Sequence, residues 1–137
     1  MRTALDTNVI SALWSNEPSA SLISSKLSGA YHSGGLVVSA PVYAELQAHP
    51  NAGSGFADNF LRHTGVVVDF VLDEDVWRLT AKSFAAYATR RHRSGGGTPK
   101  RLLVDFLIAA HAVLRADRLM TLDPSRYKQD FPQLHIV

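Results

Sequence analysis

The fold is decided by the stretch from residue 101 to residue 123, which reads RLLVDFLIAAHAVLRADRLMTLD. Apolar residues in its first part recur at three- and four-residue spacings, namely Leu102, Phe106, Ala109, Ala110 and Val113. This spacing, in a run rich in helix formers, predicts an amphipathic helix. Residues 118–122 then predict a short strand, which ends before Pro124 because proline cannot continue a central strand.

Two carboxylates mark this helix and strand. Asp105 interrupts the apolar helix on the side of a row of mostly small residues. A lone carboxylate in such a place is costly unless it is paired or bound to a cation. Asp123 stands at the carboxyl end of the predicted strand. We therefore expect the rest of the chain to supply partners for this pair.

Short apolar strands alternate with helical patterns through the rest of the chain. Strands are expected at residues 3–5, 36–39, 66–71 and 134–137, and helical spacing is found around residues 9–14, 18–31, 41–45, 56–61 and 73–87. Such alternation predicts an α/β fold with a central parallel sheet that is flanked by helices on both faces.

Length and composition set limits on what the chain is. Its 137 residues, 46% of them hydrophobic, are enough for one substantial core, so we expect one domain over residues 1–137. The absence of cysteine excludes disulfides and thiolate metal sites. No apolar run is long enough to span a membrane, and a cytoplasmic location is expected. A net charge of +2 does not by itself indicate nucleic-acid binding.

Two more carboxylates are expected at the same edge of the sheet as Asp105 and Asp123. Asp6 directly follows the first strand, and Glu45 lies one turn after Pro41 in the helix that follows the second strand. Ligand sites in parallel sheets form beyond the carboxyl ends of the strands. Unit charges about 4 Å apart repel by roughly 4 kcal/mol at an effective dielectric of 20, so four such groups require a cation. Mg²⁺ suits carboxylate and water ligands, and Mn²⁺ is a plausible substitute.

The acidic motifs resemble those of a known family. LDTNV at residues 5–9, Glu45, DFLIAA at residues 105–110 and LMTLD at residues 119–123 are similar, in this order, to the four acidic motifs of PIN-domain ribonucleases. The length is similar to that of VapC-type toxins from bacterial toxin–antitoxin pairs. The resemblance implies a three-layer PIN-like domain and a Mg²⁺-dependent endoribonuclease that hydrolyses RNA phosphodiester bonds to leave 5′-phosphate and 3′-hydroxyl ends.

The resemblance also implies roles for individual residues and for partners. By motif, Asp6, Glu45, Asp105 and Asp123 are catalytic residues that hold the metal, directly or through water. Thr7, Asn8 and Thr121 orient the carboxylates or the substrate from beside them. A homodimer and a cognate antitoxin that blocks the site are further implications. We expect the early helices and the Glu45 helix to contribute to the dimer.

Each acidic residue also has a plainer interpretation. Asp6 fits a helix cap, since Asp-Thr-Asn is a good turn sequence, and Glu45 alone is more often a solvated helix residue. Asp105 could form an ordinary ion pair with Arg101, one turn earlier. Asp123 could cap the turn before Pro124. The family motifs favour metal binding over these interpretations.

Residues 90–101 form a basic, glycine-rich segment that leads into the Asp105 helix. Three consecutive glycines and a proline predict a flexible loop. Taken alone, such a segment is more often solvated than functional. Beside an acidic nuclease site, however, positive charge would attract the phosphate backbone. We therefore expect RNA contacts from five residues in the segment: Arg90, Arg91, Arg93, Lys100 and Arg101.

Two other functions compete with RNA cleavage. The first is a non-catalytic RNA-binding or regulatory module that keeps the fold without turnover. The second is a phosphotransferase that uses Asp6 as its nucleophile, as haloacid-dehalogenase-like enzymes do. Those enzymes have a second Asp two residues later, whereas this chain has Asn8, so this reading ranks last.

Overall fold

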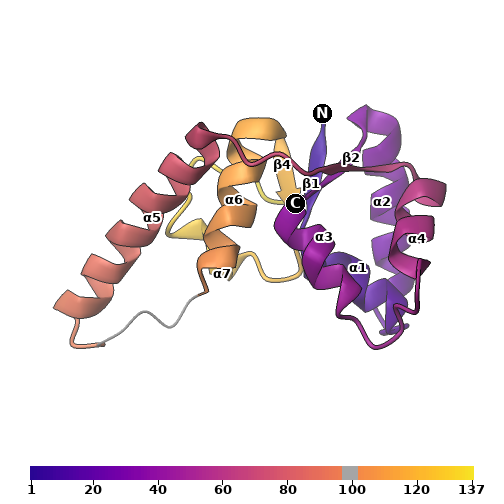
Figure 1. The fold of residues 1–137 in the computed structure, drawn as a ribbon, viewed down its shortest axis with the longest axis horizontal. Helices are drawn as coiled ribbons and strands as arrows, with labels where there is room; N and C mark the ends of the chain where they lie inside the picture. Colours follow the sequence, from indigo (N-terminus) through magenta and orange to yellow (C-terminus); the bar gives the residue numbers. More distant parts are fainter. Residues whose placement is uncertain (97–101) are drawn as a thin grey trace.

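A four-stranded parallel sheet forms the centre of the molecule (Figure 1). The computed structural model describes residues 1–96 and 102–137. The strands are β1 (Thr3–Leu5), β2 (Leu36–Ser39), β3 (Val66–Asp69) and β4 (Arg118–Met120), in the spatial order β3-β2-β1-β4. All three strand pairs are parallel, with Ala4 opposite Val37 on one side of β1 and Leu119 on the other. The predicted parallel sheet is therefore confirmed.

Helices cover both faces of this sheet. In the described residues they are α1 (Thr7–Trp14), α2 (Ala20–Gly34), α3 (Ala40–Gln47), α4 (Phe56–Thr64), α5 (Glu74–Arg93), α6 (Leu103–Arg115) and α7 (Ser125–Lys128). Figure 1 shows α5 and α6 together on one side of the strands, and α1, α2 and α4 on the other. The predicted α/β architecture with flanking helices is confirmed. None of the helices in the described parts of the chain is long and apolar enough to cross a membrane.

The core lies between the sheet and the helices that cover it. Residues of β1 and β2 are buried throughout, because the two central strands of the sheet are covered by helices on both faces. Helix α6 buries seven consecutive residues, from Phe106 to Ala112, so it lies deep in the structure and not at its surface. Gly65 ends α4 in the left-handed conformation, at φ 74°, which turns the chain directly into β3.

The carboxyl ends of three neighbouring strands lead directly to predicted site residues. Asp6 follows β1, α3 follows β2 with Pro41 in its first turn, and Thr121 to Asp123 follow β4. Helix α6 begins at Leu103, which puts Asp105 in its first turn. Helix α3 ends at Gln47, so Glu45 belongs to the last turn of that helix and not to its beginning.

The structure corrects four of the predicted boundaries. Strand β4 ends at Met120, two residues before the end of the predicted strand 118–122. Strand β3 ends at Asp69, two residues earlier than expected. Residues 134–137 form an isolated bridge between Ile136 and Leu119 in place of a strand. Residues 90–93 belong to the last turns of α5 and not to a loop, because the helical hydrogen bonds continue past the apolar pattern as far as Arg93. Residues 94–96 leave the helix in a turn, and residues 97–101, the remainder of the predicted loop, lie outside the described residues.

A buried histidine joins α6 to the end of β3. His111 is 1% exposed, and its Nε2 lies 2.9 Å from Oδ2 of Asp69. Burial lowers the pKa of His111 and outweighs the opposing effect of Asp69. Burial also raises the pKa of Asp69, but hydrogen bonds from His111 and the Val71 backbone outweigh it, and that pKa is lowered overall. The pair is therefore a neutral imidazole beside a carboxylate.

This pair predicts a loss of stability in mild acid. Below the ordinary His pKa of 6.5, the unfolded chain takes up a proton that folded His111 resists, so the free energy of unfolding decreases as the pH falls. Asp69 adds a further loss only near and below its ordinary value of 3.8. His111→Gln keeps a hydrogen-bond donor that does not titrate, so urea unfolding at pH 7.5 and 5.5 should show a smaller loss than in the wild type. His135→Gln, at an exposed histidine, is the control; an equal loss in all three proteins would contradict the prediction.

Candidate active site

Asp6 is a buried carboxylate at the end of β1. Its side chain is held by three donors: the Thr7 backbone N–H donates to Oδ1 at 2.8 Å, and the hydroxyls of Thr121 and Tyr127 donate to Oδ2 at 2.8 and 2.7 Å. Asp6 is also the N-cap of α1, so the plainer interpretation of this residue describes its geometry correctly. A carboxylate accepts about four hydrogen bonds, so the cap and the hydroxyls leave acceptor capacity for one more ligand.

Glu45 is linked to Asp6 through Thr7. The Thr7 hydroxyl donates to Oε1 of Glu45 at 2.6 Å, while the backbone N–H of the same residue bonds Asp6. Unlike Asp6, Glu45 is exposed. The predicted role of Thr7, which is to orient the carboxylates, thus has a direct geometric basis in two hydrogen bonds. The role itself remains a prediction.

Asn8 and Thr121 connect the start of α1 to the loop after β4. The Asn8 amide nitrogen donates to the Thr121 hydroxyl at 3.3 Å, and its oxygen accepts from the Leu122 backbone at 3.1 Å. The Thr121 oxygen also accepts from the Asp123 backbone at 3.1 Å. Thr121 therefore touches both Asp6 and Asp123, which fixes the loop that carries the second carboxylate relative to the first.

Asp105 and Asp123 face each other across an arginine. The two guanidinium nitrogens of Arg126 lie 3.5 Å from Oδ1 of Asp105 and 3.3 Å from Oδ2 of Asp123. The Ser125 hydroxyl also donates to Asp123, at 2.8 Å, as the turn-capping interpretation requires. Burial lowers the pKa of Arg126, but Asp105 and the neighbouring groups raise it by more, so the guanidinium stays charged. Arg101, the ion-pair partner of Asp105 that the sequence suggested, lies outside the described residues.

The sequence prediction missed two residues of this site, Arg126 and Tyr127. Tyr127 is 1% exposed and its hydroxyl points at Asp6. Burial and the adjacent Asp6 raise the pKa of this tyrosine strongly, so its proton stays in place as a hydrogen-bond donor. One signal was present in the sequence: a helix that starts after Pro124 places the residue three positions beyond Asp123 on the same side as that carboxylate.

The four predicted acidic residues are thus linked through shared hydrogen-bond and ion-pair partners. Their side chains, however, do not converge into a complete set of metal ligands. Among residues 1–96 and 102–137, no three His, Asp or Glu side chains are arranged so that they could hold a metal ion as they stand. Donors of the chain itself hold Asp6, and Arg126 supplies positive charge between Asp105 and Asp123. The donor set fits a hard cation, because it consists of carboxylate and hydroxyl oxygens.

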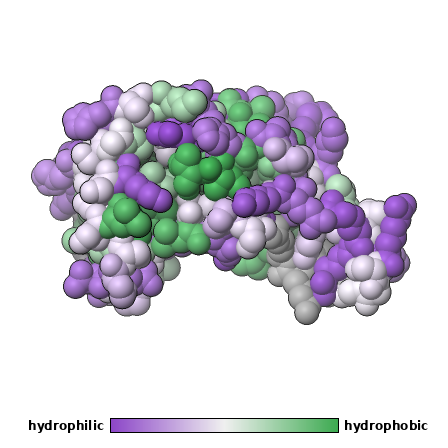
Figure 2. Space-filling model, turned by 180° about the vertical axis from the view of Figure 1, so that it is seen from behind, coloured by the Kyte–Doolittle hydropathy of each residue, from purple (hydrophilic) through white to green (hydrophobic). Residues whose placement is uncertain are grey.

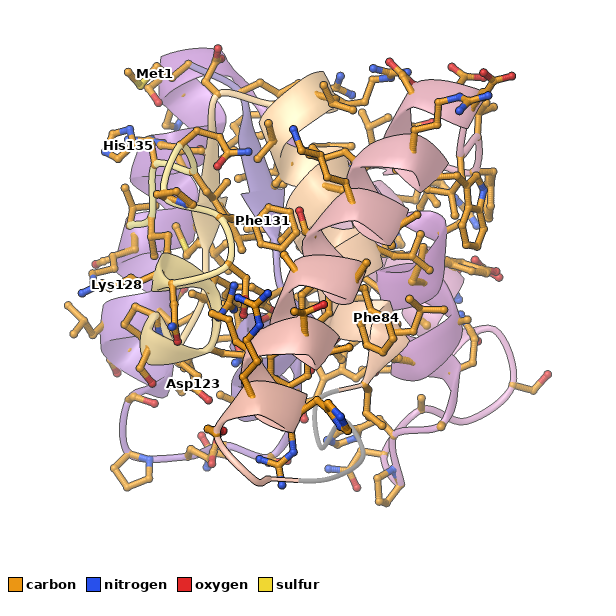
Figure 3. The ribbon with its side chains drawn as sticks, turned by 90° about the vertical axis from the view of Figure 1, so that its left-hand side faces the viewer. Met1, Phe84, Asp123, Lys128, Phe131 and His135 are labelled. Atoms are coloured by element: carbon orange, nitrogen blue, oxygen red, sulfur yellow. The ribbon has the colours of Figure 1, made fainter. Side chains whose placement is uncertain are left out.

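A buried hydroxyl at the same edge supports this fit. Ser39 ends β2, and extending the Ala4–Val37 register by two residues puts it opposite Asp6. Ser39 is 2% exposed, and its Oγ has no hydrogen-bond partner within the described part of the chain. Buried polar groups are almost always paired, so an unpaired one beside the acidic edge points to a missing ligand or water. Figure 3 shows Asp123 at the end of the molecule opposite Met1, where the carboxyl ends of the strands lie.

The predicted RNA-binding residues have different surroundings. Arg90 pairs with Asp130, whose side chain is 2% exposed, so Arg90 has a structural partner. Arg91 is half-buried and Arg93 is exposed in the last turn of α5. Figure 2 shows hydrophilic side chains at this end of α5. Lys100 and Arg101 lie outside the described residues.

An apolar cavity of about 620 Å³ lies on the other side of the sheet. It is an open hollow lined mainly by α1, α2 and α4, and its wall includes Trp14, Leu27 and Phe60. None of the four predicted acidic residues lines it. A wall of this composition does not suit a phosphodiester, so the cavity is separate from the acidic site.

Comparisons with known proteins identify the family. The PIN domain matches residues 3–131, and the chain therefore belongs to the PIN domain family. A comparison with curated proteins finds no significant match. Two solved structures with similar folds are both VapBC complexes, and each likeness extends over this whole chain.

The two solved structures come from different bacteria. One is a chain of VapBC2 from Rickettsia felis, whose crystal structure was determined with a bound DNA fragment from the VapBC2 promoter. That chain is 20% identical to the present one in sequence. The TM-score is 0.68, and the match covers 100% of this chain and 98% of that one. A chain of VapBC-1 from nontypeable Haemophilus influenzae is 26% identical, with a TM-score of 0.69 over 100% of this chain and 97% of that one.

The buried Tyr127–Asp6 hydrogen bond predicts a measurable contribution to stability. Tyr127→Phe removes the hydroxyl and leaves a buried carboxylate with one donor fewer, which should lower the free energy of unfolding by about 1.5–3 kcal/mol. Tyr43→Phe is a matched control, because the Tyr43 hydroxyl donates to Asp58 at the same 2.7 Å but at an exposed site. Urea denaturation should show a clearly smaller effect for the control, and equal effects would contradict the prediction.

Proposed function

We propose that this protein is a metal-dependent endoribonuclease and the toxin of a VapBC-type toxin–antitoxin pair. The observation that carries the proposal is the arrangement of Asp6, Asp105 and Asp123 around Arg126 and Tyr127 at the carboxyl edge of the sheet. Membership of the PIN domain family and the likeness to chains of VapBC complexes support it. The proposed catalytic and metal-binding residues remain Asp6, Glu45, Asp105 and Asp123.

The chain's own groups would perform the chemistry by holding carboxylates in place. A bound Mg²⁺ or Mn²⁺ would activate water and stabilise negative charge on the phosphate oxygens. Asp6 is locked in one orientation by its three donors, and Thr7 holds Glu45 beside it. Asn8 and Thr121 keep the Asp123 loop against the start of α1. Such fixed ligands need little reorganisation when the phosphodiester arrives.

The proposed partners are an RNA substrate, an antitoxin and a second copy of this chain. The two solved structures named above are both structures of VapBC, which supports an antitoxin partner. The apolar cavity between α1, α2 and α4 supplies surface that a protein partner could bury, away from the acidic edge. The homodimer, with contributions from α1, α2 and α3, remains an inference from the family. A single monomeric mass across protein concentrations would exclude it.

The test of the proposed function is cleavage of total cellular RNA by the purified protein. Discrete cuts should appear with Mg²⁺ or Mn²⁺ and disappear with EDTA. Asp105→Asn should lower the rate by more than about a hundredfold, since changes that only touch residues behind metal ligands already cost 10–100-fold. Glu17→Gln, at an exposed carboxylate in the turn between α1 and α2, is the control and should cleave as the wild type does. Asp6→Asn should also be inactive.

If no condition gives cleavage although the protein is folded and free of inhibitor, the nuclease proposal fails. Metal-independent RNA binding would then favour the non-catalytic module. Labelled phosphate trapped on Asp6 would instead favour the phosphotransferase.

The basic segment predicts salt-dependent RNA binding. We omit Arg90 because its removal would leave buried Asp130 without this partner, and change Arg91, Arg93, Lys100 and Arg101 to Gln. Affinity for a labelled single-stranded RNA should fall, and the slope of log K against log salt should become shallower by up to about 3, at roughly 0.7 per lost phosphate contact. Anisotropy titrations in EDTA measure both quantities without cleavage.

A control variant removes the same amount of charge from other exposed positions: Lys26, Arg62, Arg78 and Lys82. If the control weakens binding as much as the variant of the basic segment, the contacts are not local to that segment.

A further inference from the structure

Arg126 occupies the space where two of the proposed metal ligands approach each other. One of its nitrogens is 3.5 Å from Asp105, on α6, and the other is 3.3 Å from Asp123, in the loop before α7. Asp6 adds to the negative field around the same guanidinium. A positive group at this point neutralises carboxylates that would otherwise repel one another.

The contacts of Arg126 are loose for an arginine among carboxylates. Charge-assisted N–H···O hydrogen bonds are usually about 2.7–2.9 Å long, and both separations exceed this range. Arg115 provides an internal comparison, because its guanidinium bonds Asp75 at 2.7 Å and Asp73 at 3.1 Å. Arg126 therefore supplies charge to its two carboxylates without the tight bonds that Arg115 makes, and its side chain is 38% exposed and can move towards solvent.

The backbone beneath Arg126 is anchored by its neighbours in the chain. Its neighbour Tyr127 is 1% exposed and bonded to Asp6, and Phe131 packs against Phe106 of α6 with ring centroids 5.8 Å apart. These anchors keep the Arg126 backbone at the site whichever way its side chain points. Figure 3 shows Lys128, on the same short helix, on its outer side.

We propose that Arg126 is an internal counter-cation, which holds Asp105 and Asp123 together before a divalent cation binds and must move aside when one does. This inference rests on the proposed metal site and deepens it. Arg126 would act as a positioning residue that sets metal affinity: it preserves the geometry of the carboxylates and also competes for them.

The test is calorimetric titration of Mn²⁺ into the purified protein without RNA. Arg126→Gln removes the competing charge and keeps a polar side chain of similar length. It should bind Mn²⁺ about two- to thirtyfold more tightly than the wild type, as expected for the loss of two partly exposed ion pairs. Lys128→Gln removes the same charge from the outer side of the same helix and should change the affinity by less than the Arg126 variant does. Equal or weaker binding by Arg126→Gln than by the wild type would overturn the proposal.

Thermal unfolding supplies a second readout that does not depend on activity. Without metal, Arg126→Gln should unfold at a lower temperature than the wild type because its carboxylates repel one another, and Mn²⁺ should raise the unfolding temperature more in the variant than in the wild type. A merely structural role for Arg126 would lower the unfolding temperature with and without metal by the same amount. That outcome would contradict the proposal.

A double-mutant cycle connects the effect to Asp105. In an Asp105→Asn background, the gain in Mn²⁺ affinity from Arg126→Gln should shrink, because one of the two competing ion pairs is already absent. If Arg126→Gln does not fold, Arg126→Lys replaces it. Lysine keeps the positive charge but has a shorter side chain than arginine and cannot contact two carboxylates with a planar fork. Arg126→Lys should therefore give a smaller gain in Mn²⁺ affinity than Arg126→Gln, and no gain would count against the proposal.

The outcomes also separate this inference from the proposed function. Mn²⁺ binding that tightens in Arg126→Gln, in a protein that cleaves no RNA, would support the inference and contradict the nuclease proposal. Metal-dependent cleavage by a protein whose Mn²⁺ affinity is the same with and without the Arg126 side chain would support the nuclease proposal and contradict the inference. No Mn²⁺ binding by either protein would overturn both.

Discussion

The site depends on the burial of one carboxylate, Asp6, at the point where β1 ends and α1 begins. Burying a charge is costly unless it is fully hydrogen-bonded, so three separate donors from α1, the loop after β4 and α7 must all arrive there. These donors tie together the two ends of the chain. The same contacts that make burial possible therefore also bring Asp123 and Arg126 to the acidic edge.

Charge balance is the second constraint on this edge. Parallel strands bring their carboxyl ends together, and here that topology concentrates acidic side chains that repel one another. Two features of the structure reduce this repulsion. Hydroxyl and backbone donors surround Asp6, and the guanidinium of Arg126 lies between Asp105 and Asp123. A cation bound by oxygen ligands would meet the same electrostatic need, so Arg126 and a metal ion act on the same carboxylates.

Much of the fold could be predicted from local pattern. The parallel sheet and the helix around Asp105 follow from apolar periodicity, which is a property of adjacent residues and survives without tertiary information. The end of α5 was missed because Arg90 to Arg93 carry no apolar signal, although the helix continues through them and Arg90 pairs with Asp130. Residues 134–137 looked like a strand, but backbone pairing with Leu119 is limited to a single bridge.

The sequence by itself determined the class of fold, the order of the acidic motifs and the residue types that could hold a hard cation. Spacing along the chain contains that information, because helical and strand periods are local. Only the tertiary structure decided that Tyr127 reaches Asp6, that Thr7 joins Asp6 to Glu45, and that Arg126 lies between Asp105 and Asp123. Most of these contacts span tens of residues or more, so no local pattern specifies them, and they form only when the sheet assembles and brings its carboxyl ends together.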